Sequence, residues 1–218
     1  MYQVVRNSWI TFCSLHFGAM TSSEGASRRG RPITRNREHV VDTAMNAYWQ
    51  DDNAAVSVNA ICALAKVSKP SLYREFGSED GLTTAVLDRY AQAVLEPLKA
   101  LLSRPTTFDA KLDAMIDFAS HDPRMATGGL FVKMGATRSR FGPHTRSRIA
   151  AIEADMLEGY ARFFREAAIG GEKRCDIGAD LAAAYLYEQM GLAVSQRASG
   201  KSPASVRELL ALALSVLR

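Results

Sequence analysis

The sequence has few cysteines, and no hydrophobic run in it is long enough to cross a membrane. Cys13, Cys62 and Cys175 are odd in number and far apart in the 218 residues, so they predict neither a disulfide framework nor a metal-ligand cluster. A reducing, cytoplasmic setting is the expectation that follows. No apolar stretch reaches the roughly 18 residues of a membrane-spanning helix. The partly apolar segment 9–17 is interrupted by polar residues and lacks a clean cleavage site, which argues against a signal peptide.

Catalytic and metal-binding signatures are also missing. His121, Asp122, His144 and Asp176 show no metal-ligand spacing and form no recognisable catalytic dyad. We therefore expect no metal, no cofactor and no enzymatic activity. Strand-like alternation and internal repeats are absent as well. With 47% hydrophobic and 23% charged residues, the composition is that of an ordinary globular chain.

What the sequence does contain is helical periodicity along most of its length. Amphipathic segments cover about 35–50, 78–90 and 149–170, and Pro97 and Pro105 are expected to break the chain after the second of them. These patterns predict an all-α fold. The stripe of the first segment consists of Val40, Val41, Ala44, Met45, Tyr48 and Trp49.

Two short helices are predicted next to each other, at 58–65 and 69–75. Ser57 and Ser68 stand at their N-cap positions, and Pro70 occupies the first turn of the second helix, where its missing N–H costs nothing. A longer helix followed by two short helices with a connection of about three residues is typical of a DNA-binding helix-turn-helix. In such a motif the second short helix reads the DNA.

The predicted reading helix has an apolar side and a polar side. Leu72 and Phe76, four residues apart, are expected to face the core, which turns the opposite side outward. The outward side chains suit base edges, thymine methyl groups and phosphates. The residues of this region predicted to bind DNA are Ser57, Lys69, Pro70, Ser71, Tyr73 and Arg74.

A basic arm precedes the first of these helices. Residues 28–37 contain five arginines and no acidic side chain, although the whole chain carries a net charge of only +4. An Arg-Gly-Arg-Pro core is narrow enough to enter the minor groove, where arginine meets enhanced negative potential. An isolated basic run is more often a solvated tail, but its position beside a helix-turn-helix favours DNA contact. Arg28, Arg29, Arg31 and Arg35 are therefore added to the predicted DNA-binding residues.

Residues 37–82 carry a succession of short motifs. They are Val41-x-x-Ala44, Ser57-Val58-x-x-Ile61, Val67-Ser68-Lys69-x-Ser71-Leu72-Tyr73-x-x-Phe76-Gly77-Ser78 and Gly81-Leu82, of which Ser-Leu-Tyr-x-x-Phe is the most diagnostic. By these motifs the segment resembles the N-terminal domain of the TetR (tetracycline repressor) family. The resemblance implies a three-helix DNA-binding head, a linking fourth helix, and a helical domain that binds a small effector and dimerises through its last two helices. It also implies DNA contacts for Lys69, Ser71, Tyr73 and Arg74, with Tyr73 on a phosphate.

The sequence departs from the family pattern at three positions. Asp52 and Lys66 stand where the family usually has glycine, at the end of the first helix and in the turn. We expect Lys66 to adopt a left-handed conformation, which costs a non-glycine residue on the order of 1 kcal/mol. Glu79 replaces a common lysine, which removes the basis for one phosphate contact.

The last two predicted helices, at about 180–198 and 203–217, are apolar on more than one face. They must be covered by the rest of their own domain or by a second subunit, and the resemblance favours a homodimer. Ser205 and Glu208 have capping-box spacing, which predicts the start of the final helix near them.

An effector pocket is expected among core-facing side chains of the central helices. Aromatic and methionine side chains there suit an apolar or aromatic ligand. A second basic cluster, Arg138, Arg140, Arg146 and Arg148, is predicted to be solvated surface, with an anion site as the alternative. The candidate effector-binding residues are Phe131, Met134, Phe141, Met156, Tyr160, Phe163, Tyr185 and Gln189.

These observations divide the chain into three parts. Residues 1–27 are expected to be disordered or an over-extended start, 28–80 to form the DNA-binding head with its arm, and 81–218 to form the effector-binding and dimerisation domain. The predicted function is that of a repressor which a small molecule releases from a palindromic operator. The alternatives are a helical protein-interaction module with an architectural helix-turn-helix, and a small helical enzyme.

Overall fold

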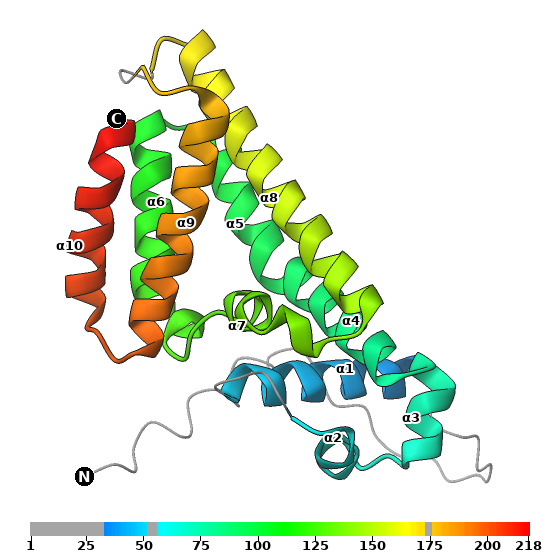
Figure 1. Ribbon diagram of the computed structural model, residues 1–218. Helices are drawn as coiled ribbons and strands as arrows, with labels where there is room; N and C mark the ends of the chain where they lie inside the picture. Colours follow the sequence, from blue (N-terminus) through cyan, green and yellow to red (C-terminus); the bar gives the residue numbers. More distant parts are fainter. Residues whose placement is uncertain (1–32, 52–55, 173–175) are drawn as a thin grey trace, which may run out of the picture. The chain divides into compact units, whose positions relative to one another are not determined.

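The computed structural model describes residues 33–51, 56–172 and 176–218, and every regular element within these ranges is a helix (Figure 1). The all-α prediction is therefore confirmed. The expectations for residues 1–27, for Arg28, Arg29 and Arg31, and for Asp52 and Cys175 concern positions outside the described ranges. None of the described helices combines the length and the apolarity that crossing a membrane requires.

The first three helices pack around a small core of their own. They are α1 (Ile33–Gln50), α2 (Val58–Ala65) and α3 (Lys69–Phe76). The predicted stripe of α1 is buried except for the half-buried Met45, and Ile61 of α2 and Leu72 of α3 close the core against it. Cys62 is buried in α2 and belongs to the same core. Burying this apolar set is what holds two helices of only eight residues in place, since neither is stable alone.

The fourth helix does not end at Pro97, contrary to the sequence prediction. Helix α4 (Glu79–Tyr90) runs through a π-helical turn (Ala91–Leu95) into α5 (Glu96–Leu102) without leaving the helical region of backbone space. Proline in a helix lacks the N–H that would bond the carbonyl four residues earlier, and its ring crowds that carbonyl. A wider π turn directly before the proline relieves the crowding.

Arg124 supplies the hydrogen bond that Pro97 cannot. Its Nη1 donates to the carbonyl oxygen of Ala93, four residues before the proline, at 3.1 Å. The same guanidinium donates to the Asp122 carboxylate through Nε at 2.9 Å and through Nη2 at 2.6 Å. This pairing lowers the pKa of Asp122 and raises that of Arg124, although burial acts against both shifts. A residue 27 positions along the chain thus lets the helix continue past Pro97.

Arg124→Met is expected to lower the free energy of unfolding by about 1–3 kcal/mol, because it leaves the Ala93 carbonyl and the Asp122 carboxylate without their donor. Urea denaturation followed by circular dichroism measures the change. Arg162→Met, which removes an exposed arginine of the C-terminal region, is the control and should change stability by less than about 0.5 kcal/mol. Equal stability of the two variants would show that the π turn alone accommodates Pro97.

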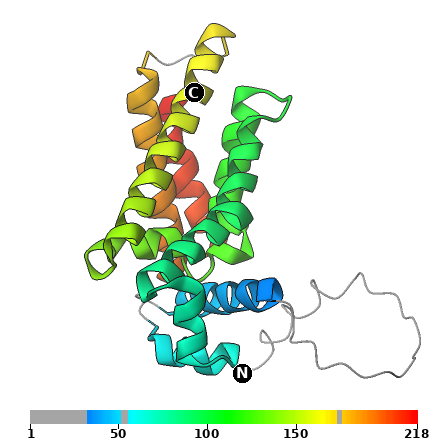
Figure 2. The same ribbon diagram turned by 90° about the vertical axis from the view of Figure 1, so that its right-hand side faces the viewer.

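The remaining helices form a bundle with the α4–α5 helix. They are α6 (Phe108–His121), α7 (Leu130–Ala136), α8 (Pro143–Ile169), α9 (Ala179–Ala198) and α10 (Pro203–Leu214), with short 3-10 turns at 123–125, 138–140 and 215–217. Helix α8 packs along α9 and against α4, and α10 packs on α6 and α9 (Figures 1 and 2). Phe108, Phe163 and Phe164 fill the contact between α6 and α8 with ring centroids 5.0 to 5.9 Å apart.

The final helix begins at Pro203, as its predicted range has it, but its cap is not the serine that the capping-box spacing predicted. Ser202, not Ser205, is the N-cap, and its Oγ accepts from the Ser205 N–H at 3.2 Å. Pro203 takes the first helical position, where a proline is well tolerated. The capping-box prediction was wrong because Ser-Pro at 202–203 is the stronger start signal.

Candidate nucleic-acid interface and ligand pocket

The turn between α2 and α3 has the geometry expected from the sequence. Lys66 lies in the left-handed region with φ 55° and ψ 44°, which confirms the prediction for this position. Its N–H donates to the carbonyl of Ala63, and Val67 N–H donates to that of Cys62, so both bonds close the end of α2. Ser57 Oγ accepts from Ala60 N–H at 3.2 Å, and Ser68 Oγ from Ser71 N–H at 3.3 Å, as caps of the two helices.

Helix α3 presents the polar side that the sequence predicted to face outward. Leu72 is only 2% exposed, whereas Lys69, Pro70 and Arg74 are exposed. Tyr73 is half-buried, with its ring packed against the core and the Lys69 ammonium 5.8 Å from the ring centroid. Two basic groups and a phenol therefore lie together on one open helix face, a combination that suits phosphates and base edges.

Contacts within the head hold side chains of α3 in place. Arg74 Nη2 donates to Ser71 Oγ at 3.3 Å, which holds the guanidinium along the outward face. On the other flank, Arg37 of α1 lies over the Phe76 ring at 5.2 Å and pairs with Glu75 at 3.2 Å. Arg35 lies in the first two turns of α1. The other three arginines predicted for the arm lie outside the described residues.

The turn between α3 and α4 leaves no room for a side chain at Gly81. A Cβ there would lie 2.0 Å from the carbonyl oxygen of Phe76, which is backbone and cannot move aside. Ser78 caps α4 by accepting from the Gly81 N–H at 3.0 Å. Glycine is thus required at position 81 for a steric reason, because α4 starts directly against the end of the reading helix.

Asp80 of α4 binds the start of α8. Its two carboxylate oxygens accept from the His144 and Thr145 N–H groups at 2.9 Å each, which are the free donors at the start of α8. The Thr145 hydroxyl also bonds the backbone carbonyl of Asp80 at 3.1 Å. A Cβ at Gly142 would lie 2.3 to 2.7 Å from the carboxylate, so this approach requires glycine. Burial alone would raise the pKa of Asp80, but these hydrogen bonds outweigh it and leave the pKa below its ordinary value.

Asp80→Asn is expected to lower the free energy of unfolding at pH 7 by about 1 kcal/mol, because an amide offers one acceptor to two donors. A carboxylate with a lowered pKa in the folded state stabilises the fold above its unfolded pKa of about 3.9, and this stabilisation is lost as the pH falls through the folded value. The difference from the unchanged chain should therefore shrink below about pH 4. Urea denaturation at both pH values measures it, with the exposed Asp176→Asn as control. A pH-independent difference would exclude the charge as its cause.

Helix α7 is joined to the end of α1. Trp49 Nε1 donates to the carbonyl of Gly128 at 2.7 Å, a buried bond between the head and the segment leading into α7. In the opposite direction, Lys133 Nζ of α7 donates to the carbonyls of Trp49 at 2.7 Å and Asp51 at 3.1 Å. A cation at the C-terminal carbonyls of a helix is favourable, so Lys133 caps α1 from another part of the chain.

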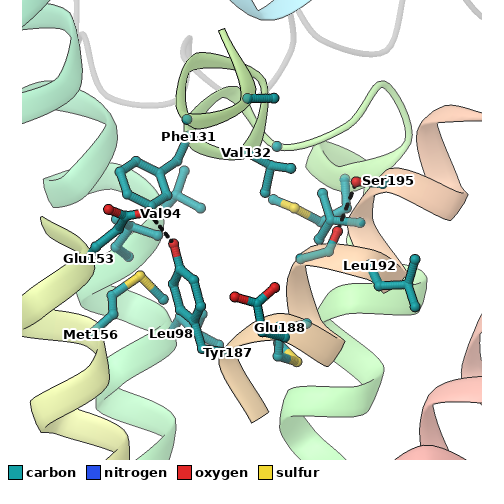
Figure 3. A pocket seen from close by; sticks show the side chains of 18 of the residues that line it. Val94, Leu98, Phe131, Val132, Glu153, Met156, Tyr187, Glu188, Leu192 and Ser195 are labelled. Atoms are coloured by element: carbon teal, nitrogen blue, oxygen red, sulfur yellow. Dashed lines mark hydrogen bonds between the residues drawn. The ribbon is translucent and has the colours of Figure 1, made fainter. Parts of the chain in front are cut away.

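A pocket of about 450 Å³ opens between α7, α8, α9 and the α4–α5 helix (Figure 3). This volume is in the range of small-molecule sites. Three of the predicted effector-binding residues line it: Phe131, Met156 and Tyr160. Lining residues that sequence reasoning missed include Val94, Leu98, Val132, Tyr187, Glu188 and Leu192.

The other five predicted effector-binding residues do not line this pocket. Phe163 stacks on Phe108 at 5.0 Å, and the Tyr185 hydroxyl donates to the Ala213 carbonyl at 3.0 Å, which fixes α9 to α10. Met134 is fully buried, and Phe141 and Gln189 are half-buried. Aromatic and methionine side chains fill the ordinary core as well as the pocket wall, so residue type alone does not separate the two.

The polar groups of the pocket are few. Tyr187 Oη donates to Glu153 at 3.3 Å, and Arg138 Nη2 pairs with the same carboxylate at 2.9 Å (Figure 3 shows the first of these). The Tyr160 hydroxyl is fully buried and has no hydrogen-bond partner among the described residues. Burial raises the pKa of both tyrosines, so both hydroxyls stay neutral near pH 7. Within the described ranges, no group of three or more potential ligands is arranged to hold a metal ion.

A head with an exposed reading helix, followed by a helical bundle with a small-molecule-sized pocket, defines a class of helix-turn-helix regulatory proteins. The family described as bacterial regulatory proteins, tetR family, matches residues 40–86. Residues 40–86 thus form a domain that matches the tetR family, which confirms the resemblance found in the sequence.

Two curated relatives match over part of their length. The HTH-type transcriptional repressor ComR of Escherichia coli (strain K12) is 40% identical over 62 residues, which is 28% of this chain and 30% of ComR. The HTH-type transcriptional activator FasR of Mycolicibacterium smegmatis is 31% identical over 105 residues, 45% of this chain and 48% of FasR. The chain thus spans 30% to 48% of the length of these relatives, and both are named as transcriptional regulators, not enzymes.

Solved structures share the fold over most of the chain. E. coli NemR in its reduced form aligns with a TM-score of 0.74 and 20% identity, covering 84% of this chain and 97% of NemR. A cysteine-substituted form of the TetR-family regulator CifR, complexed with 26-bp double-strand operator DNA, aligns with a TM-score of 0.70 and 17% identity over 89% of this chain and all of CifR. At these identities the likeness concerns the fold.

Proposed function

We propose that this chain is a DNA-binding regulator of transcription which releases a palindromic operator when a small molecule occupies its pocket. The observation that carries the proposal is the open face of α3, where Lys69, Tyr73 and Arg74 are accessible while Leu72 anchors the helix beneath. One such helix fits the major groove. The DNA contacts of Ser57, Pro70, Ser71 and the arginines of the arm belong to the same proposal. Binding to chromosomal DNA would place the protein in the cytoplasm.

The proposed regulator acts as a homodimer through α9 and α10. Large apolar side chains are exposed on both helices: Leu181 is 67% exposed, Leu192 51% and Leu212 70%. The two helices lie side by side, so their exposed faces form one region that a second copy of the chain would cover (Figure 2). A two-fold dimer would place two reading helices on the half-sites of a palindrome.

The proposed response to ligand passes through α7. This helix contributes Phe131 and Val132 to the pocket wall and, one residue on, Lys133 to the end of α1. A ligand that displaces α7 would act on the Lys133 and Trp49 bonds and so on the head. Such a shift needs a ligand that binds the two arrangements of the head with different affinity. Repression follows if the operator overlaps the promoter.

Selection of duplexes that bind the purified chain tests the proposal. We expect a palindromic sequence to be recovered, and its affinity to fall steeply with salt because phosphate contacts release counterions. A reporter gene behind the operator distinguishes repression from activation. The enzyme alternative is not supported, since the matched relatives are regulators and the pocket holds no nucleophile–base pair that the structure describes. Failure to bind any duplex at low salt would leave the helix-turn-helix as an architectural element of an interaction protein.

A further inference from the structure

The charged groups that line the pocket do not balance. Three lining residues carry charge near neutral pH: Arg138, Glu153 and Glu188. Arg138 is fully engaged, since Nη2 and Nη1 contact Glu153 at 2.9 and 3.4 Å and Nε donates to the Gly135 carbonyl at 3.1 Å. The pair of Arg138 and Glu153 is therefore neutral as a unit and offers no free cation to an anionic ligand.

Glu188 is the charge that remains. Its carboxylate makes no hydrogen bond or ion pair with any residue in the described part of the chain. Figure 3 shows this carboxylate pointing into the space enclosed by Tyr187, Ser195 and Val132. The pocket thus has a net negative charge, although the whole chain has a net charge of +4.

The rest of the wall is apolar and aromatic. Phe131, Met156, Val94 and Leu98 surround the space, and the Tyr187 ring lies next to Glu188 (Figure 3). Such a wall excludes small hydrated ions, because nothing in it replaces their water. The Tyr160 hydroxyl lies beneath this surface, since it is fully buried and exposes no area to a bound molecule.

We propose that the pocket takes a hydrophobic organic cation. Its apolar or aromatic body would pack on Phe131 and Met156, and its positive charge would lie near Glu188 and over the face of Tyr187. Glu188 is exposed, so water screens part of this attraction, and the apolar wall supplies the rest of the proposed affinity. The proposal names the ligand class for the response set out under Proposed function and rests on it, but binding itself is measured without DNA.

Tetraphenylphosphonium and tetraphenylborate provide the test, because they have nearly the same size and shape and opposite charge. Isothermal titration of the full-length chain should show the cation binding at least about tenfold more tightly than the anion. The positive net charge of the chain favours the anion, so this preference would have to come from the pocket. Tighter binding of tetraphenylborate, or no binding of tetraphenylphosphonium at millimolar concentration, would overturn the proposal.

Glu188→Gln tests whether Glu188 is the source of the preference for the cation. It should weaken tetraphenylphosphonium binding about tenfold and leave or improve tetraphenylborate binding. Glu166→Gln makes the same change of charge at an exposed position of α8, outside the pocket, and should leave both affinities unchanged. Val132→Trp fills the pocket and should abolish binding of both ions. Unchanged cation affinity in Glu188→Gln, with the fold confirmed by circular dichroism, would refute the assigned charge contact.

The outcomes separate this proposal from the regulatory one. If the chain binds the cation through Glu188 but binds no duplex, the proposed ligand class stands and the proposed regulatory function is refuted. If the chain binds its operator but prefers the anion, the regulatory function stands and the ligand class is refuted.

Discussion

Replacing Tyr73 and Arg74 together by alanine is expected to lower operator affinity by about 1,000-fold or more. Each residue would contribute one contact per half-site, a base-edge or phosphate contact is worth about 1–3 kcal/mol, and a dimer makes each contact twice. The slope of log affinity against log salt should also become shallower by about 2, since one arginine per subunit no longer displaces counterions. Fluorescence anisotropy with the selected operator at several salt concentrations measures both quantities.

Two controls make this result specific to the reading face. Arg104→Ala removes the same charge from an exposed position beyond α5 and should change affinity only slightly. Tyr73→Phe keeps the ring that packs against the core and removes the hydroxyl alone, so it separates a phosphate contact from a packing effect. If the double variant folds and still binds the operator as tightly as the unchanged chain, the outward face of α3 is not the DNA-binding surface.

Leu181→Glu combined with Leu212→Glu is expected to convert the dimer to a monomer. Burying two unpaired carboxylates per subunit in an apolar interface costs several kcal/mol, more than a standard interface tolerates at its centre. Operator affinity should then fall by about 100-fold or more, because each head would bind its half-site independently of the other. Sedimentation equilibrium measures the mass of the species, and anisotropy measures the affinity.

Ile169→Glu is the matched control for the dimer variant. Ile169 is 89% exposed at the end of α8, so it is an equally accessible apolar residue outside α9 and α10. This variant should remain dimeric and bind the operator normally. A dimer that persists in the Leu181 and Leu212 variant would place the interface on another surface, and monomers in the Ile169 variant would place it at the end of α8.

The DNA-binding head is the part that was most predictable from the sequence. Its features depend on interactions over three to five residues. Ser57 and Ser68 each cap the helix that follows by accepting from the N–H group three residues ahead, and Lys66 ends the helix just before it. Helix boundaries and the outward face of α3 follow from such local rules and from the period of the apolar stripe. The same rules placed the start of α10 correctly at 203 but chose Ser205 in place of Ser202 as its cap.

The course of the chain at Pro97 and the composition of the pocket were not predictable in this way. The local sequence at Pro97 predicts a helix end, but a π turn before the proline and a hydrogen bond from Arg124 accompany a helix that continues. In the pocket, Phe131 and Met156 look no different in sequence from Phe163, which fills the core. No local pattern indicates that Glu188 and Glu153 lie at one cavity while Arg138 neutralises only one of them.

The sequence by itself determined which segments are helical, where most of them begin, and which side of the reading helix is free, because these depend on the backbone and on near neighbours along the chain. Only the tertiary structure decided where a ligand-sized space remains, which charges inside it are paired, and how α7 reaches the head. These properties depend on side chains that lie far apart in sequence and meet only after the helices have packed.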